Sequence, residues 1–215
     1  SLPVADPRAG YLLSTNPNGN FTGVVVGDGP SGLAVNDRPN NFWGNPFTST
    51  TGSNSNAKYI FKDAMPWPMM TAAEMKFVKA EALYRKGQKA LALAAYKEGI
   101  QTSMDMLTSV YSASVPAAYT MTQAIKDAYV ANPLVVPTDP NNLNLSMIML
   151  QKYIALYGYG LHETWTDLRR YHYTDLEAGS TRQVYTNFTP PLPNKLYPDN
   201  KLKYVYRKRP RYNSE

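Results

Sequence analysis

TAAEMKFVKAEALYRKGQKALALAAYKEGIQTSMDM, at residues 71–106, is the stretch that decides the fold. Thr71 followed by Glu74 forms a capping box, in which each side chain accepts a hydrogen bond from the backbone amide of the other residue. This motif predicts a helix start. Gly87 predicts the helix end, because glycine readily adopts the left-handed conformation that closes a helix. An alanine-rich helix follows at once, and so short a turn predicts an antiparallel helix pair.

Three more helices are predicted downstream of this pair. Residues 119–130 are amphipathic and stop at Asn132-Pro133, and residues 145–158 and 162–171 again carry apolar side chains at helical spacing. Similar triplets, KFV in the first pair and KYI in the second, hint at a degenerate helical repeat. The sequence therefore predicts a mainly α fold built from helix pairs.

The two ends of the chain differ from the helical scaffold predicted at residues 67–175. Residues 1–66 are rich in Gly, Pro, Asn, Ser and Thr, which predicts loops, with candidate strands only at residues 21–26 and 58–61. Residues 176–215 are rich in proline and tyrosine and are predicted to be extended. We expect one domain with long loop-rich segments at both ends.

The composition excludes several kinds of site. The chain of 215 residues has no cysteine, which removes disulfides, thiolate zinc sites and thiol catalysis. No apolar run approaches the ~20 residues of a membrane-spanning helix, and the first residues do not resemble a signal peptide. The net charge of +6 resides in a C-terminal cluster, namely Lys201, Lys203, Arg207, Lys208, Arg209 and Arg211. Because no nucleic-acid-binding motif accompanies this cluster, we favour an extended segment with solvated charges over a nucleic-acid surface.

No familiar catalytic or cofactor motif is present. His162 and His172 are ten residues apart, whereas two metal ligands on one helix need a spacing of three or four. The chain also lacks a glycine-rich phosphate loop and a GxSxG nucleophile turn. We therefore expect no metal, no other cofactor and no enzymatic activity.

The densest polar cluster lies in the last predicted helix, at Glu163, Trp165, Asp167, Arg169 and Arg170. Paired carboxylates can perform acid and base catalysis on a glycosidic bond. Glu163 and Asp167, however, lie four residues apart beside two arginines, an arrangement typical of ion pairs that fix a helix to its neighbours. We favour this structural interpretation and expect Trp165 to be a core anchor.

Aromatic residues in the first loop-rich segment are the candidate ligand site. Trp43, with Phe42, Asn41 and Trp67 in support, could bind a sugar, because aromatic rings stack on its C–H faces and amides bond to its hydroxyls. The same residues would equally suit pinning long loops against the helices. The residues alone leave both interpretations open.

Six segments in order resemble the SusD/RagB family of Bacteroidetes surface proteins. Residues 163–170 match that family's E-x-W-x-D-x-R-R signature, and residues 69–82 match one of its helices. The other similar segments are residues 6–8, 94–104, 151–156 and 211–215. The resemblance covers almost the full length of the chain and is therefore specific.

The resemblance implies a largely α-helical fold with tetratricopeptide-like helix pairs. Members are outer-membrane lipoproteins that bind glycans or other nutrients at the cell surface and pass them to a SusC-type TonB-dependent transporter. They are not enzymes. A full member is about twice this long and carries a signal peptide and a lipid-bearing cysteine, so the chain resembles the C-terminal half. The family's ligand-binding residues vary, so none transfers to this sequence.

These observations together predict a cell-surface nutrient-binding protein, with an oligosaccharide as the expected ligand and membrane contact only through a lipid anchor. An alternative is a helical-repeat adaptor whose groove binds a peptide or a partner protein. A third hypothesis is a glycoside hydrolase that uses Glu163 and Asp167.

Overall fold

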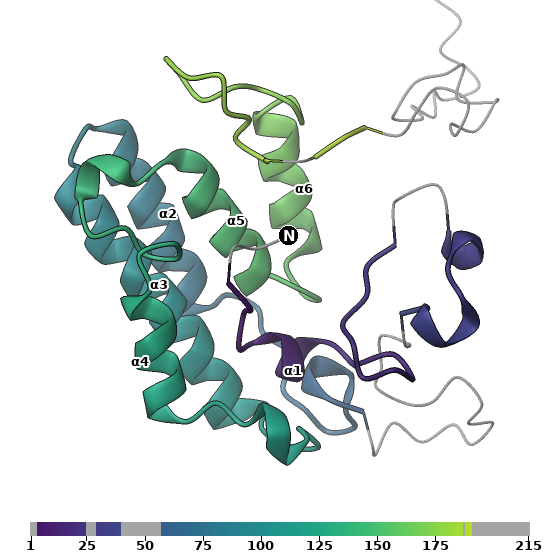
Figure 1. Cartoon of the computed structure of the whole chain (residues 1–215). Helices are drawn as coiled ribbons and strands as arrows, with labels where there is room; N and C mark the ends of the chain where they lie inside the picture. Colours follow the sequence, from purple (N-terminus) through teal and green to yellow (C-terminus); the bar gives the residue numbers. More distant parts are fainter. Residues whose placement is uncertain (1–3, 25–28, 40–56, 187, 191–215) are drawn as a thin grey trace, which may run out of the picture.

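The protein is mainly α-helical, as the sequence predicts (Figure 1). The computed structural model describes residues 4–24, 29–39, 57–186 and 188–190. Its α-helices are α1 (Ala9–Leu12), α2 (Ala72–Arg85), α3 (Lys89–Val110), α4 (Gln123–Ala131), α5 (Leu145–Ala155) and α6 (Leu161–Arg170). Its short 3-10 helices are η1 (Pro30–Gly32), η2 (Val35–Asp37), η3 (Tyr59–Phe61), η4 (Ala117–Tyr119) and η5 (Pro140–Asn142). Within these described ranges there is no strand, and residues 176 and 183 form one isolated antiparallel bridge.

The antiparallel pair of α2 and α3 forms as its sequence predicts, and the two helices lie side by side in Figure 1. The Thr71 side chain accepts a hydrogen bond from the Glu74 amide at 3.2 Å, which confirms the predicted cap. Gly87 has a φ of +74°, and the amide of Gln88 donates to the Leu83 carbonyl at 3.0 Å. This is the Schellman geometry that ends α2 and reverses the chain.

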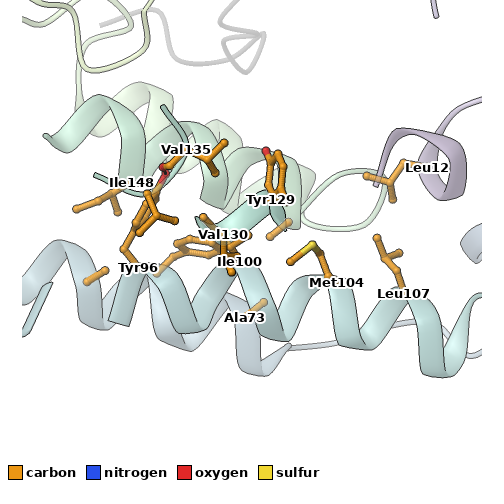
Figure 2. Close-up of a cluster of buried hydrophobic side chains, with 14 of the residues drawn as sticks. Leu12, Ala73, Tyr96, Ile100, Met104, Leu107, Tyr129, Val130, Val135 and Ile148 are labelled. Carbon is orange, nitrogen blue, oxygen red and sulfur yellow. Dashed lines mark hydrogen bonds between the residues drawn. The ribbon is translucent and has the colours of Figure 1, made fainter. Parts of the chain in front are cut away.

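The core lies along one face of α3. Figure 2 shows Tyr96, Ile100, Met104 and Leu107 on this face, at the spacing of successive helical turns. Side chains from three other helices cover them: Leu12 of α1, Tyr129 and Val130 of α4, and Ile148 of α5. Full burial of one such large apolar side chain contributes about 1.5–3 kcal/mol. The small buried residues of α2 and α3, which are themselves part of this core, allow the close approach of the two helices.

The later helices follow the prediction with shifted ends. α4 begins at Gln123 and not at residue 119, because the Thr122 side chain accepts from the amide of Ile125 and residues 117–119 form the separate η4. α5 ends at Ala155, three residues before the predicted end at 158. α6 lies within one residue of its predicted range. The tetratricopeptide-like arrangement of these helices stays a prediction.

The prediction of a strand at residues 58–61 is wrong. This stretch forms η3, in which Tyr59 has a φ of +56°, outside the extended region of a strand. The Tyr59 hydroxyl donates to the Tyr157 carbonyl at 3.1 Å, and its ring packs edge-on against Tyr111 at 4.7 Å between centroids. These distant contacts, rather than local propensity, determine the backbone here. The described part of the other candidate strand, residues 21–24, has no regular secondary structure.

A buried arginine attaches the N-terminal segment to three helices. Arg8 is 0% exposed and binds both carboxylate oxygens of Asp6, at 2.9 and 2.5 Å. Its guanidinium also donates to Gln151 of α5 at 2.5 Å and to Ser103 of α3 at 3.3 Å. The Tyr129 hydroxyl of α4 donates to Asp6 at 2.9 Å. Residues 6–8 are therefore an integral part of the core.

Candidate functional site

Trp67 is the one predicted ligand residue that the structure describes, and its side chain is 57% exposed. It lies in the loop ahead of α2, where the carbonyl of the preceding Pro66 accepts from the Tyr111 hydroxyl at 2.7 Å. The backbone is thus fixed while the indole faces solvent. The other three predicted ligand residues lie outside the described part of the chain: Asn41, Phe42 and Trp43.

Exposed methionines follow Trp67 at the start of α2. Met69 is 90% exposed, and Met70 and Met75 are also largely exposed. Methionine side chains are flexible and polarizable, and methionine and tryptophan are enriched where proteins contact one another. We call Trp67, Met69, Met70 and Met75 the Trp67 surface.

A groove of about 680 Å³ lies between the N-terminal segment and the start of α4. Most of its lining is apolar, and it includes Val4, Pro7, Gly10, Phe21, Tyr119 and Ile125. The rings of Phe21 and Tyr119 lie 5.4 Å apart at an angle of 57°. Phe21 is 39% exposed, so part of this aromatic pair is open to a ligand. We call this hollow the aromatic groove.

Gly10 allows the aromatic groove to form. A Cβ atom on Gly10 would lie 2.2 Å from the Cβ of Tyr119, closer than any real contact. The amide of Met121 donates to the Tyr11 hydroxyl at 3.2 Å, which holds the chain after η4 against α1. The position of Tyr119 therefore depends on a contact between residues far apart in the sequence.

Sequence reasoning missed the aromatic groove, because Phe21 was assigned to a strand and Tyr119 to a helix start. The available signal was the position of Phe21 directly after an asparagine-rich turn, in a segment already expected to carry function. In that turn the Asn16 side chain accepts from the amide of Asn20 at 2.9 Å. The turn thus fixes the backbone just before the ring.

Two members of the polar cluster of α6, Asp167 and Arg170, form ion pairs, as the structural interpretation predicts, whereas Glu163 and Arg169 are exposed. Asp167 is buried and accepts from Lys152 of α5 at 2.6 Å and from Arg170 at 2.8 Å. Arg170 also binds both oxygens of Glu81 on α2, at 2.5 and 2.8 Å. Burial raises the pKa of Glu81, but hydrogen bonds from Arg170, Tyr171 and Arg85 outweigh it and lower the pKa to about 2. This network fixes α6 to α2 and α5.

The prediction that Trp165 is a core anchor is wrong. Its side chain is 45% exposed, and the Arg169 guanidinium lies 4.7 Å from the centroid of its ring. Only Asp167 of α6 is buried, so the apolar side chains of this helix border solvent. Glu163 is exposed as well, so the two carboxylates of the hydrolase hypothesis lie in different environments.

The comparisons with known proteins give one match. The model of a SusD-like family described as "Starch-binding associating with outer membrane" matches residues 2–197. The chain belongs to this SusD-like family. The suspected SusD/RagB resemblance is thereby confirmed. No curated protein and no solved structure matches the chain at a significant level.

For a SusD-like chain, half-exposed rings are the features that suit starch and related glycans. A ring face can lie on the C–H groups of a sugar, and neighbouring polar groups then orient the hydroxyls. The described residues offer such rings at Trp67 and at the aromatic groove. They contain no group of three or more His, Asp or Glu side chains that could hold a metal ion.

The family description associates its members with the outer membrane. Within the described ranges no helix has both the length and the apolar character needed to cross a bilayer.

Proposed function

We propose that this SusD-like protein binds glycans at the cell surface and delivers them to a SusC-type TonB-dependent transporter. The observation that carries the proposal is the family match over residues 2–197. The exposed indole of Trp67 and the aromatic groove support it, because both present ring surface to solvent. The protein binds its ligand by stacking and hydrogen bonding, without covalent change and without a cofactor.

The ligand residues we propose are Trp43, Phe42 and Asn41, with Trp67 in support. Trp43 would stack on a sugar ring, and the Asn41 amide would bond to its hydroxyls. Other nutrients with an apolar face and polar edges would satisfy the same residues.

A glycan array followed by calorimetry on the strongest-binding glycan tests this proposal. We expect wild-type protein to bind, and Trp43→Ala and Trp67→Ala to bind about tenfold more weakly, which corresponds to the loss of one stacking contact. Trp165→Ala is a matched control, because it removes another exposed indole that we do not assign to the site. Unchanged affinity in Trp43→Ala and Trp67→Ala would contradict these ligand residues. Binding to no glycan would contradict the function.

The absence of catalysis is tested with the same glycans. Asp167 is engaged in ion pairs with Lys152 and Arg170, which leaves Glu163 without a second free carboxylate on α6. We therefore expect no new reducing ends when the protein is incubated with the bound glycan. Release of reducing ends that disappears in Glu163→Gln would establish the hydrolase hypothesis instead.

A second candidate function, a helical-repeat adaptor, is favoured by one observation. The Trp67 surface exposes an indole and three methionines within residues 67–75, a composition typical of protein interfaces. An adaptor would bind a peptide or protein through this surface and would give no signal on the glycan array. Co-purification of a partner that is lost in Met69→Ser/Met70→Ser, together with a blank array, would select the adaptor.

A further inference from the structure

A polar pocket of about 300 Å³ lies away from the aromatic groove. It is bounded by the end of α2, by the residues that lead into α5, and by the loop at residues 177–182. The side chains that matter are those of Tyr84, Asn141, Asn142, Glu177 and Arg182. We call it the Glu177 pocket. Its volume is at the lower end of the range for ligand sites, about 300–1,000 Å³, which suits a single small ring.

Glu177 is a buried carboxylate with one oxygen that lacks a hydrogen bond. The residue is 7% exposed. Its Oε1 accepts from the amide of Leu145 at 3.1 Å and from the Tyr84 hydroxyl. Its Oε2 is buried and accepts no hydrogen bond; its charged contact is the ion pair with Arg182 Nη1, which lies 3.6 Å away, beyond hydrogen-bonding distance. A buried carboxylate oxygen without a hydrogen bond is costly, so a ligand group that donates to it would be stabilised.

The charged groups around the Glu177 pocket determine which class of ligand it favours. Arg182 is half-exposed beside the carboxylate, and the Lys89 ammonium lies 3.1 Å from the centroid of the Tyr84 ring. Two cationic side chains disfavour a metal ion, whereas the buried carboxylate disfavours an anion. A neutral ligand with several hydroxyls meets neither penalty. It can donate to the carboxylate and accept from the guanidinium at once.

We infer that the Glu177 pocket is a subsite for one sugar unit of a neutral glycan. Because Oε2 is covered in the structure, the half-exposed Arg182 side chain shifts as the ligand binds; one hydroxyl of the sugar then donates to Glu177 Oε2, and the oxygen of a neighbouring hydroxyl accepts from Arg182. The amides of Asn141 and Asn142, which line the pocket and are exposed, bond to the remaining hydroxyls. The inference rests on the proposed glycan-binding function and adds to it a second contact point, built from polar groups.

Calorimetry on the whole chain tests the subsite with two variants. The probes are maltohexaose and the strongest-binding neutral glycan of the array. Glu177→Gln keeps the acceptor for Leu145 but replaces the free oxygen by an amide, and Arg182→Ala removes a half-exposed side chain without opening the core. We expect each variant to bind about tenfold more weakly or worse, as for loss of a hydrogen bond to a charged group. Arg169→Ala, an exposed arginine outside the pocket, should bind within about twofold of wild type.

Each outcome separates the subsite from the general function. If wild type binds and Trp43→Ala or Trp67→Ala weakens binding while both pocket variants bind normally, the subsite is wrong and the function stands. If wild type binds no glycan on the array, the function fails and the subsite fails with it. If glucuronate or Ca²⁺ binds in an Arg182-dependent or Glu177-dependent way and neutral glycans do not, the neutral-sugar chemistry is overturned.

Discussion

Glu81 shows how one buried carboxylate joins two helices, α2 and α6. It accepts from Arg170 of α6, from the Tyr171 hydroxyl at 2.5 Å and from Arg85 one helical turn along α2. The pKa of this carboxyl, raised by burial but lowered more strongly by Arg170 and its other partners, falls to about 2. The charged form is therefore the form that stabilises the fold.

We expect Glu81→Gln to cost about 2–3 kcal/mol of unfolding free energy at pH 7. The folded pKa lies below the unfolded value of 4.5, so this stabilisation is complete above pH 4.5 and is lost as the pH falls toward 2. Denaturant unfolding at pH 7, 4 and 3 should show the gap between wild type and variant closing with acidity. Burial raises the pKa of Asp6, but Arg8 lowers it more strongly. This effect is the same in wild type and in Glu81→Gln, so it does not change the difference between them. If the difference in unfolding free energy between wild type and Glu81→Gln stayed constant with pH, the lowered pKa of Glu81 would be contradicted.

Gly10 is predicted to control the aromatic groove. In Gly10→Ala the new methyl group would clash with Tyr119, so we expect a loss of about 1–3 kcal/mol. Glycan affinity should fall as well if the groove binds ligand, because the ring of Tyr119 must move away from Phe21. Gly23→Ala is the control, since nothing lies within 4 Å of its added Cβ. Equal melting temperatures for the two variants would show that Tyr119 adjusts without cost.

At the scale of the helix, Thr71 should contribute more than an ordinary cap. Its hydroxyl oxygen accepts from the Glu74 amide and also lies 2.9 Å from the Tyr159 hydroxyl, which joins α2 to the turn before α6. We expect Thr71→Ala to cost about 1–2 kcal/mol, or roughly 2–8 °C in melting temperature. Thr71→Ser keeps the hydroxyl and should lose less than half of that. A serine variant as unstable as the alanine variant would assign the effect to the methyl group.

Local signals predicted the helices well, because caps and helix ends are encoded within a few residues. Thr71 and Gly87 gave the bounds of α2, and Asn132-Pro133 gave the end of α4. The errors occurred where a contact with a residue far along the chain determines the backbone conformation. Tyr59 leaves the extended region because it packs on Tyr111, and no local pattern contains that contact.

The exposure of Trp165 and the aromatic groove were missed for a related reason. An amphipathic pattern shows which residues share a face of a helix but not whether a neighbour covers that face. The apolar side chains of α6 at positions 161 and 165 share a face that borders solvent in the described structure. The candidate site likewise depends on Phe21 and Tyr119 meeting across almost a hundred residues, which only the folded chain reveals.

The whole molecule depends on the contact between its N-terminal segment and its helices. Arg8 and Asp6 form a buried ion pair whose remaining hydrogen bonds go to Ser103, Tyr129 and Gln151. A buried charge that loses its partner is strongly unfavourable, whereas removing both charges together costs much less. The aromatic groove is lined by this same segment, so its shape depends on the pair.

A double-mutant cycle measures that dependence. We expect Arg8→Met and Asp6→Asn each to cost about 3–5 kcal/mol, and the double variant to cost less than their sum by about 1–3 kcal/mol. The exposed pair of Lys76 and Glu98, with Nζ and Oε2 2.6 Å apart, is the control. The coupling of this exposed pair should be much weaker than that of Arg8 and Asp6, because solvent screens it. Equal couplings in the two cycles would mean that the N-terminal segment lies on the helices without being part of their core, and the groove beside it would then have no fixed wall.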